Sequence, residues 1–452
     1  MSNQAPPANQ ILQGNIGTTL RKMTMPVLAG MLTLMTFNLV DTFFISMLGT
    51  TPLAAISFTF PVTFTVISLA IGLSIGTSAI IAKALGAGHN KEAQADSLAA
   101  LWLATYLVLA LSLLGMALIN PLFSLLGAEQ NTLGYIQDYM LIWFAGAVLL
   151  VMPMVGNAVL RASGDTKTPS LIMASGGVVN AILDPIFIFG IGPVPAMGMQ
   201  GAALASVMSW ALGCGLIIWL LFKRGLLVAL WQPFALAIPI YRKILRIGMP
   251  AAGANMLTPL AMAILTAIMA SYGAAAVAAF GVGIRLESLA SLVVLALSMT
   301  LPPFISQNFG ADKLQRVQQA YQLSTFFILR WQFAVYVLLA LLAWPIAAMF
   351  TDDADVARYI RWFLWIVPLA YGLQGITILT NSSFNALHLP VNALWLSLIR
   401  LFIFYVPLAW AGGKVFGVVG VFAGCVVANV FTAAIAYTWF NRVSLFKLKE
   451  SA

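Results

Sequence analysis

Two aspartates lie inside apolar stretches, where an ionisable side chain needs a reason. Asp41 stands in FNLVDTFFI, and Asp184 stands in NAILDPIFIFG, four residues after Asn180. Residues four apart share one face of a helix, and Pro185 frees a backbone carbonyl beside them. Carboxyl, amide and carbonyl oxygens together form a pocket that can hold a proton or a small hard cation such as Na⁺. Two neighbouring carboxyls titrate as a coupled pair, which is the chemistry of ion-driven exchange.

Four more charged residues lie in apolar stretches. Glu287 is two residues after Arg285, and residues two apart on a helix do not face each other. We therefore expect each to find a partner on another helix or to extend towards the interface. The alternative is that Glu287 is an auxiliary cation-binding or substrate-binding carboxylate. Arg330 and Arg400 are expected to snorkel or to lie at the interface.

The composition predicts a membrane protein. Of 452 residues, 61% are hydrophobic and only 8% are charged, whereas soluble domains have about 25% charged residues. We expect an all-α protein, because the apolar runs are too long for barrel strands. Nucleic acid is not expected as a partner, because the basic residues that give the net charge of +9 lie in short loops.

No catalytic motif is present. Cys214 and Cys425 fall in apolar runs, and His89 and His388 stand in loops without ligand partners nearby. We find no Walker A motif, no metal-ligand spacing and no nucleophile elbow. The sequence therefore predicts a protein that is no enzyme, has no cofactor and no fixed metal, and draws its energy from an ion gradient.

Twelve apolar runs are long enough to cross a bilayer. Their alternate loops differ strongly in basic residues, which places both termini in the cytoplasm of a multi-pass protein of the bacterial inner (plasma) membrane. The predicted spans are 23–48, 53–82, 97–119, 135–159, 169–190, 198–222, 246–270, 276–303, 320–349, 359–382, 393–411 and 416–440.

An internal repeat relates the two halves at an offset of 224 residues. Met25-Pro26 recurs as Met249-Pro250, and Asn157 meets Asn381. Because six spans is an even number, both halves enter from the same side as two parallel six-helix lobes. We expect a cytoplasmic tail, an N-lobe, an interfacial linker, a C-lobe and a second tail, at residues 1–22, 23–222, 223–245, 246–441 and 442–452.

The second half serves as an internal control for the two aspartates. Position 41 corresponds to Leu265, and the stretch matching 180–185 has Phe402 to Pro407, with the proline kept and the carboxylate lost. A carboxylate confined to one half indicates function, so we place the coupling site in the N-lobe. Pro26 is interpreted either as a helix-start proline or as a hinge for the first span.

Methionines offer adaptable contacts for flat apolar ligands. Met31, Met35 and Met173 are our candidates for a central cavity. They would suit organic cation and drug substrates, with the lipid bilayer as the other partner of a monomeric chain.

The motifs resemble those of the multidrug and toxic compound extrusion (MATE) transporters, specifically the DinF-like branch. The resemblance rests on Pro26, NLVDTFF, AKALGAGHNKEA, VLRASGDTKTP, NAILDP and GAALAS, and covers nearly the whole chain. It implies two six-helix lobes that export organic cations and drugs in exchange for H⁺ or Na⁺, by rocker-switch alternating access. It also implies that the first span bends at its proline.

The same resemblance implies roles for further residues. The cation network would include Tyr139 and Ser206 beside Asp41, Asn180 and Asp184, with Na⁺ bound by the last three. Substrate would contact Asn157, Met173 and Asn180. The NorM-type branch instead uses an acidic residue on the tenth span, and WFLWIVPLAYGLQGITIL has none.

Two other functions remain open at this point. A lipid-linked saccharide flippase of the same superfamily should have a cavity lined with Arg and Lys and often extra helices. A membrane scaffold or channel would not need aspartates confined to one lobe.

Overall fold

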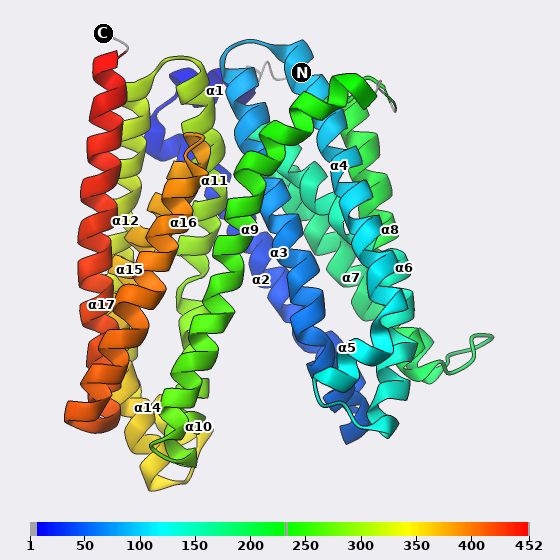
Figure 1. Ribbon diagram of the computed structural model, residues 1–452, viewed down its shortest axis with the longest axis vertical. Coiled ribbons are helices and arrows are strands. Elements are labelled where there is room, and N and C mark those ends of the chain that lie inside the picture. The colour runs from blue at the N-terminus through cyan, green and yellow to red at the C-terminus, as the bar shows by residue number, and fades with distance from the viewer. Residues whose placement is uncertain (1–6, 230, 232–233, 451–452) are drawn as a thin grey trace. The chain divides into compact units, whose positions relative to one another are not determined.

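The computed structural model describes residues 7–229, 231 and 234–450. The remaining parts of the predicted tails (1–6 and 451–452) and linker (230, 232 and 233) lie outside the described residues. Within the described residues the regular structure is helical, as predicted (Figure 1). The helices are α1 (Pro7–Gln13), α2 (Ile16–Ser46), α3 (Thr50–Gly86), α4 (Asn90–Ala117), α5 (Ile119–Leu125), α6 (Gln130–Ala162), α7 (Lys167–Phe189), α8 (Gly198–Lys223), α9 (Phe234–Ala270), α10 (Ala274–Ala290), α11 (Leu292–Gly310), α12 (Leu314–Leu341), α13 (Ala343–Phe350), α14 (Ala354–Ile366), η1 (Val367–Ala370), α15 (Tyr371–Ala386), α16 (Pro390–Leu398), η2 (Ile399–Tyr405) and α17 (Val406–Glu450).

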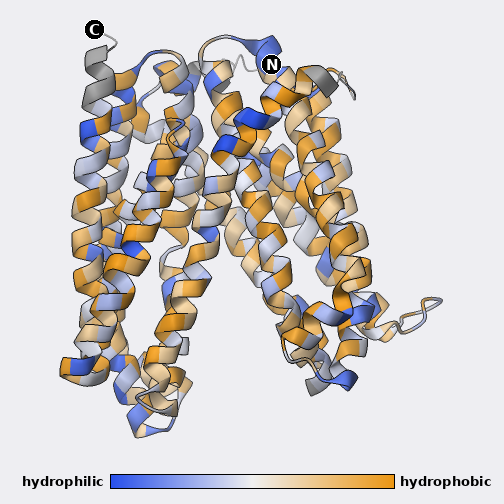
Figure 2. Ribbon diagram, in the orientation of Figure 1, coloured by the Kyte–Doolittle hydropathy of each residue, from blue (hydrophilic) through white to orange (hydrophobic). Residues whose placement is uncertain are grey.

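Eleven helical stretches of the described residues are long and apolar enough to cross a membrane. The last of them, Pro390–Ser444, has 55 residues, and its backbone is non-helical at Phe416 and Gly417. That turn separates two spans, which gives the predicted twelve. Hydrophobic residues predominate along the helices (Figure 2). The predicted span 276–303 is interrupted, because α10 ends at Ala290 and α11 begins at Leu292.

Packing divides the chain into two compact units. The N-unit is Met25–Ala252, and the C-unit is Met1–Thr24 with Gly253–Ala452. Leu20 and Met23 are buried in the core of the C-unit, and Thr24 Oγ1 lies 2.8 Å from Thr300 Oγ1. Hydropathy predicted where the helices lie along the sequence. Which of the two units each helix end packs in depends on tertiary contacts. In the C-unit, α1 and the C-terminal end of α17 lie at the same end (Figure 1), as an even number of spans requires.

The first half of α9 packs in the N-unit, although the following spans belong to the C-unit. A Cβ at Gly72 would lie 2.3 Å from the Gly248 oxygen, and one at Gly76 would lie 2.7 Å from the Ile244 oxygen. These glycines let α3 and α9 touch backbone to backbone. Residues 234–245 of the predicted linker are therefore the helical start of α9.

The backbone turns show the internal repeat directly. Three pairs of turn residues at the 224-residue offset have positive φ, and the second half has a non-glycine residue in two of them. A left-handed backbone costs such residues roughly 1–2 kcal/mol, so the tertiary fold must hold these turns. The pairs are Gly49 (117°) with Gly273 (103°), Gly88 (79°) with Asp312 (57°), and Gly164 (92°) with His388 (61°).

Candidate functional site

Helices α2 and α7 pack closely at two small residues. A Cβ at Gly30 would lie 3.0 Å from the Ser170 Cβ, and one at Gly177 would lie 2.3 Å from the Phe37 ring. Both pairs are 140 residues apart, so the two helices run parallel in a fixed register. Asp41 follows Phe37 by one turn and Asp184 follows Gly177 by two turns. The same register places Asp41 opposite Ala181, within one helical turn of Asp184.

The two carboxyl groups meet in the N-unit. Asp41 and Asp184 lie within hydrogen-bonding reach of each other, a contact that a proton on either carboxyl would complete. Asp184 is fully buried. The Asn180 amide Nδ2 donates to Asp184 Oδ1 at 3.1 Å. The predicted clustering of Asp41, Asn180 and Asp184 is therefore present.

Helix α8 contributes Ser206 through another close approach. A Cβ at Gly201 would lie 2.4 Å from the Phe187 oxygen, so α8 packs against the α7 backbone. This places Ser206 Oγ 3.4 Å from Asn180 Nδ2. Tyr139 on α6 is near enough to interact electrostatically with both carboxyls. Ser206 and Tyr139, implied by the family resemblance, thus join the cluster.

Two oxygens of the cluster lack partners. Asp41 Oδ1 and Asp184 Oδ2 are buried without a hydrogen bond. Leaving a buried acceptor unpaired costs about 1–3 kcal/mol, more for a charged group. A proton or a small cation would satisfy both oxygens. The described residues hold no group of three or more His, Cys, Asp or Glu side chains that could bind a metal.

The predicted substrate residues are more dispersed. Asn157 is buried in α6 with its Oδ1 unpaired, and it lies 18 residues after Tyr139, about 27 Å along the helix. Met173 is half-buried on α7, two turns before Asn180, and Met31 and Met35 are half-buried on α2. Asn157 is therefore remote from the carboxyl cluster, whereas Met173 lies on the same face of α7 as Asn180.

Pro26 lies in the interior of its helix. Helix α2 begins at Ile16, ten residues earlier, so the helix-start interpretation is wrong. The sequence hid this because residues 16–22 are too polar to extend an apolar run. They are helical because they pack in the C-unit.

Three charged side chains of the helices can be compared with the sequence predictions: one prediction is wrong, one is confirmed, and one buried carboxyl was not predicted. Arg400 is 8% exposed, so its predicted snorkelling is wrong: neighbouring helices cover its head group. Glu287 does find a partner on another helix, as Gln374 Nε2 donates to its Oε1 at 2.9 Å. Asp96 on α4 is 1% exposed with both carboxyl oxygens unpaired. It stands in KEAQADSL, just before the predicted span 97–119, so no apolar run indicated its burial.

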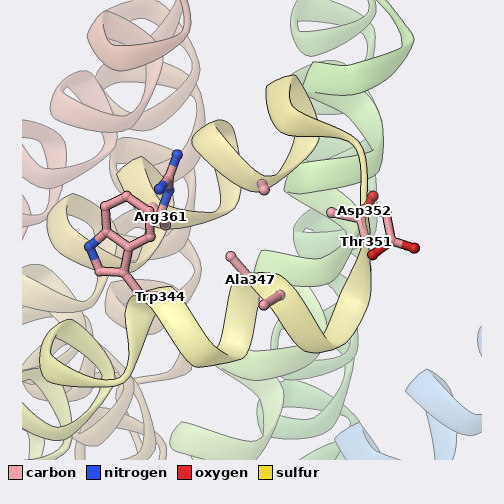
Figure 3. A pocket seen from close by; sticks show the side chains of 7 residues that line it. Trp344, Ala347, Thr351, Asp352 and Arg361 are labelled. Carbon is pink, nitrogen blue, oxygen red and sulfur yellow. The ribbon is translucent and has the colours of Figure 1, made fainter.

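A surface hollow of about 300 Å³ lies between α13 and α14 in the C-unit (Figure 3). The Arg361 guanidinium stacks 3.7 Å from the centre of the Trp344 ring on one side, and Thr351 and Asp352 line the other. None of the predicted site residues lines it. It is therefore separate from the carboxyl cluster.

Comparison with known families settles the class of protein. The sequence profile of the MatE family matches residues 26–186 and 250–411. The chain belongs to the MatE family. The two matches begin at Pro26 and Pro250, which are 224 residues apart, the offset of the internal repeat. The chain is thus a multi-pass MATE transporter and not an enzyme, as predicted.

Several relatives match almost end to end. An FAD transporter of Shewanella oneidensis is 42% identical over 434 residues, 96% of each chain. A probable multidrug resistance protein NorM of Thermotoga maritima is 24% identical over 93% of this chain and 91% of its own. A Vibrio cholerae MATE transporter, VcmN, solved in the bent form, is 34% identical with a TM-score of 0.90, covering 96% of this chain and 98% of that one.

The packing of α2 on α7 yields a test that leaves both carboxyls in place. We expect Gly177→Ala to lower transport severalfold, because its methyl group would collide with Phe37 and separate Asp41 from Asp184. Gly176→Ala is the matched control, since its nearest neighbour would be the Ser209 oxygen at 3.9 Å. Transport by each variant in proteoliposomes checks this. Equal loss in both variants would contradict it.

Proposed function

We propose that this MATE transporter is an antiporter that exports a large planar solute in exchange for H⁺ or Na⁺. The observation that supports it is the contact between two carboxyls, Asp41 and Asp184, inside membrane spans. Ionisable groups at that depth are expensive to bury and are functional by default. Assignment to the DinF-like branch, the lobe limits, the monomeric state and the cytoplasmic termini stay predictions.

The carboxyl pair can couple ion entry to the charge and packing of the N-unit. With both carboxyls deprotonated, the unpaired oxygens of Asp41 and Asp184 disfavour the closely packed cluster. A proton can bridge the two groups, and Na⁺ can bind the same oxygens together with the side-chain oxygen of Asn180. Entry of the ion from outside then changes the charge of the N-unit and favours release of the cargo.

Replacing one carboxyl tests the coupling. We expect Asp41→Asn to abolish ion-driven transport, because the amide can neither release a proton nor carry the charge that Na⁺ requires. Reconstituted vesicles under a pH gradient alone, and then under a Na⁺ gradient alone, also identify the ion. Asp138→Asn is the control, since Asp138 lies on α6 outside the pair and accepts from Gln200 Nε2 at 2.8 Å. Full gradient-driven transport by Asp41→Asn would refute the coupling role.

A hinge in α2 would let the units move for rocker-switch access. The helix passes from the C-unit to the N-unit between Thr24 and Met25, directly before Pro26, where the missing N–H leaves one carbonyl free. In the second half, α9 passes from the N-unit to the C-unit between Ala252 and Gly253, close to Pro250. Both crossings therefore lie within three residues of a proline.

Restoring the missing hydrogen bond tests the hinge. We expect Pro26→Ala to reduce turnover severalfold without loss of thermal stability, because a straight helix resists bending. Pro61→Ala is the matched control, since Pro61 likewise lies inside a helix, α3, but within the N-unit. The turnover of purified, reconstituted variants is the measurement, and unchanged turnover in Pro26→Ala would exclude the hinge.

Two cargoes follow from different observations. FAD is favoured by the Shewanella relative, which is 42% identical. Organic cations and drugs are favoured by the N-unit carboxyls and by relatives named as multidrug proteins at 23–25% identity. The lipid-linked saccharide flippase finds no such support. We give FAD precedence because its relative is the more similar.

Flavins released by cells distinguish the cargoes. We expect cells that overproduce the chain to accumulate FAD in the medium, and Asp41→Asn to return the amount to background. Ethidium efflux from the same cells is measured in parallel. Ethidium efflux without FAD release would reverse the order of the two cargoes.

A further inference from the structure

A second polar cluster, in which Tyr371 and Arg400 are buried and Glu287 and Gln374 are half-buried, lies inside the C-unit. Glu287 on α10 accepts from Gln374 on α15 at 2.9 Å. Tyr371 is one turn before Gln374 on the same helix and is 2% exposed. Arg400 lies on η2 and is 8% exposed. Both Arg400 and Tyr371 are near enough to interact electrostatically with Glu287.

Hydrogen-bond donors in this cluster lack acceptors. The Arg400 Nε and the Tyr371 hydroxyl are buried without a partner. Arg400 also has no ion pair within the part of the chain that the structure describes. Gln374 engages one oxygen of Glu287, so the other carboxylate oxygen can accept a further hydrogen bond. Buried polar groups are nearly always paired, so this pattern indicates that a ligand or solvent completes it.

The local backbone is also unusual at this point. Residues Ile399–Tyr405 form a π-helix, a rare geometry that is frequent at functional sites. It places the Arg400 guanidinium 5.9 Å from the centre of the Tyr405 ring, where a cation–π contact fixes its direction. The π-helix thus holds a buried cation near Glu287.

The repeat shows that the fold does not need these groups. At the 224-residue offset, Glu287 corresponds to Thr63, Tyr371 to Ala147, and Gln374 to Leu150. The first half folds into six spans without an ionisable group at any of these places. The cluster is therefore an addition to the C-unit.

We propose that Glu287, Arg400 and Tyr371 form a recognition site for the edge of a planar heterocycle in which an N–H lies between two carbonyls. The carboxylate accepts the ring N–H, and the guanidinium and phenol donate to the carbonyls. The isoalloxazine ring of a flavin has such an edge. The inference rests on the proposed FAD cargo. It names the isoalloxazine edge as the part of FAD that the C-unit recognises.

Methylation of the flavin at N3 tests the site, because it removes only the ring N–H. Riboflavin and N3-methylriboflavin are titrated against the full chain in lipid nanodiscs by flavin fluorescence. We expect the methyl compound to bind the wild type at least about tenfold more weakly, as loss of a hydrogen bond to a charged group predicts. Glu287→Met should bring the ratio of the two Kd values to about one.

Two further variants separate recognition from structural damage. Arg330→Gln is the matched control, since Arg330 is exposed and stacks on Phe326 at 3.9 Å; it should keep the wild-type ratio. Tyr371→Phe should weaken both flavins severalfold and keep the ratio, because it loses one carbonyl contact. This second variant tests the site even where Glu287→Met does not fold.

A wild-type ratio near one, or a ratio kept in Glu287→Met, would overturn the proposal and leave a solvent-filled structural cluster. A chain that releases FAD from cells but shows a ratio near one keeps its proposed function and loses only this site. Absence of FAD release, with no riboflavin bound by the wild type, removes the cargo and the site together.

Discussion

Two carboxyl groups within hydrogen-bonding reach, in a chain whose surroundings are lipid, set the central constraint on this molecule. Asp41 and Asp184 cannot both be charged there without a counter-ion, because desolvation and mutual repulsion act in the same direction. A proton or a cation must be present or the packing must change. Neighbouring side chains fix the pair: Asn180 donates to Asp184, Ser206 lies beside Asn180, and Tyr139 is near both carboxyls.

That contact depends on residues with almost no side chain. Gly30 and Gly177 let α2 lie against α7, and Gly201 lets α8 reach the α7 backbone. In a bilayer, helices gain little from hydrophobic burial against each other, so close packing at small residues carries much of their association. The same glycines that stabilise the helix pair therefore set the separation of the carboxyls.

The two halves share a backbone plan and differ in the polar atoms that they leave unpaired. In the N-unit cluster the unpaired atoms are carboxyl oxygens, which suit a proton or a cation. In the C-unit cluster they include the Arg400 Nε and the Tyr371 hydroxyl around a partly free Glu287. One ancestral six-helix fold, recognisable in its positive-φ turns, thus has different chemistry in each half. A transporter that exchanges an ion for a larger solute has use for both.

The sequence by itself determined the twelve spans, the repeat, the family and the Asp41–Asn180–Asp184 set, because apolar length, offset and intramembrane charge are local or periodic signals. Tertiary structure decided what those signals cannot carry. It brought α2 and α7 into register, buried Arg400 and Asp96, and placed Pro26 inside its helix, next to the point where the chain leaves the C-unit. Each of these depends on contacts between residues far apart in the chain, and hydropathy along a single segment does not record which neighbour covers it.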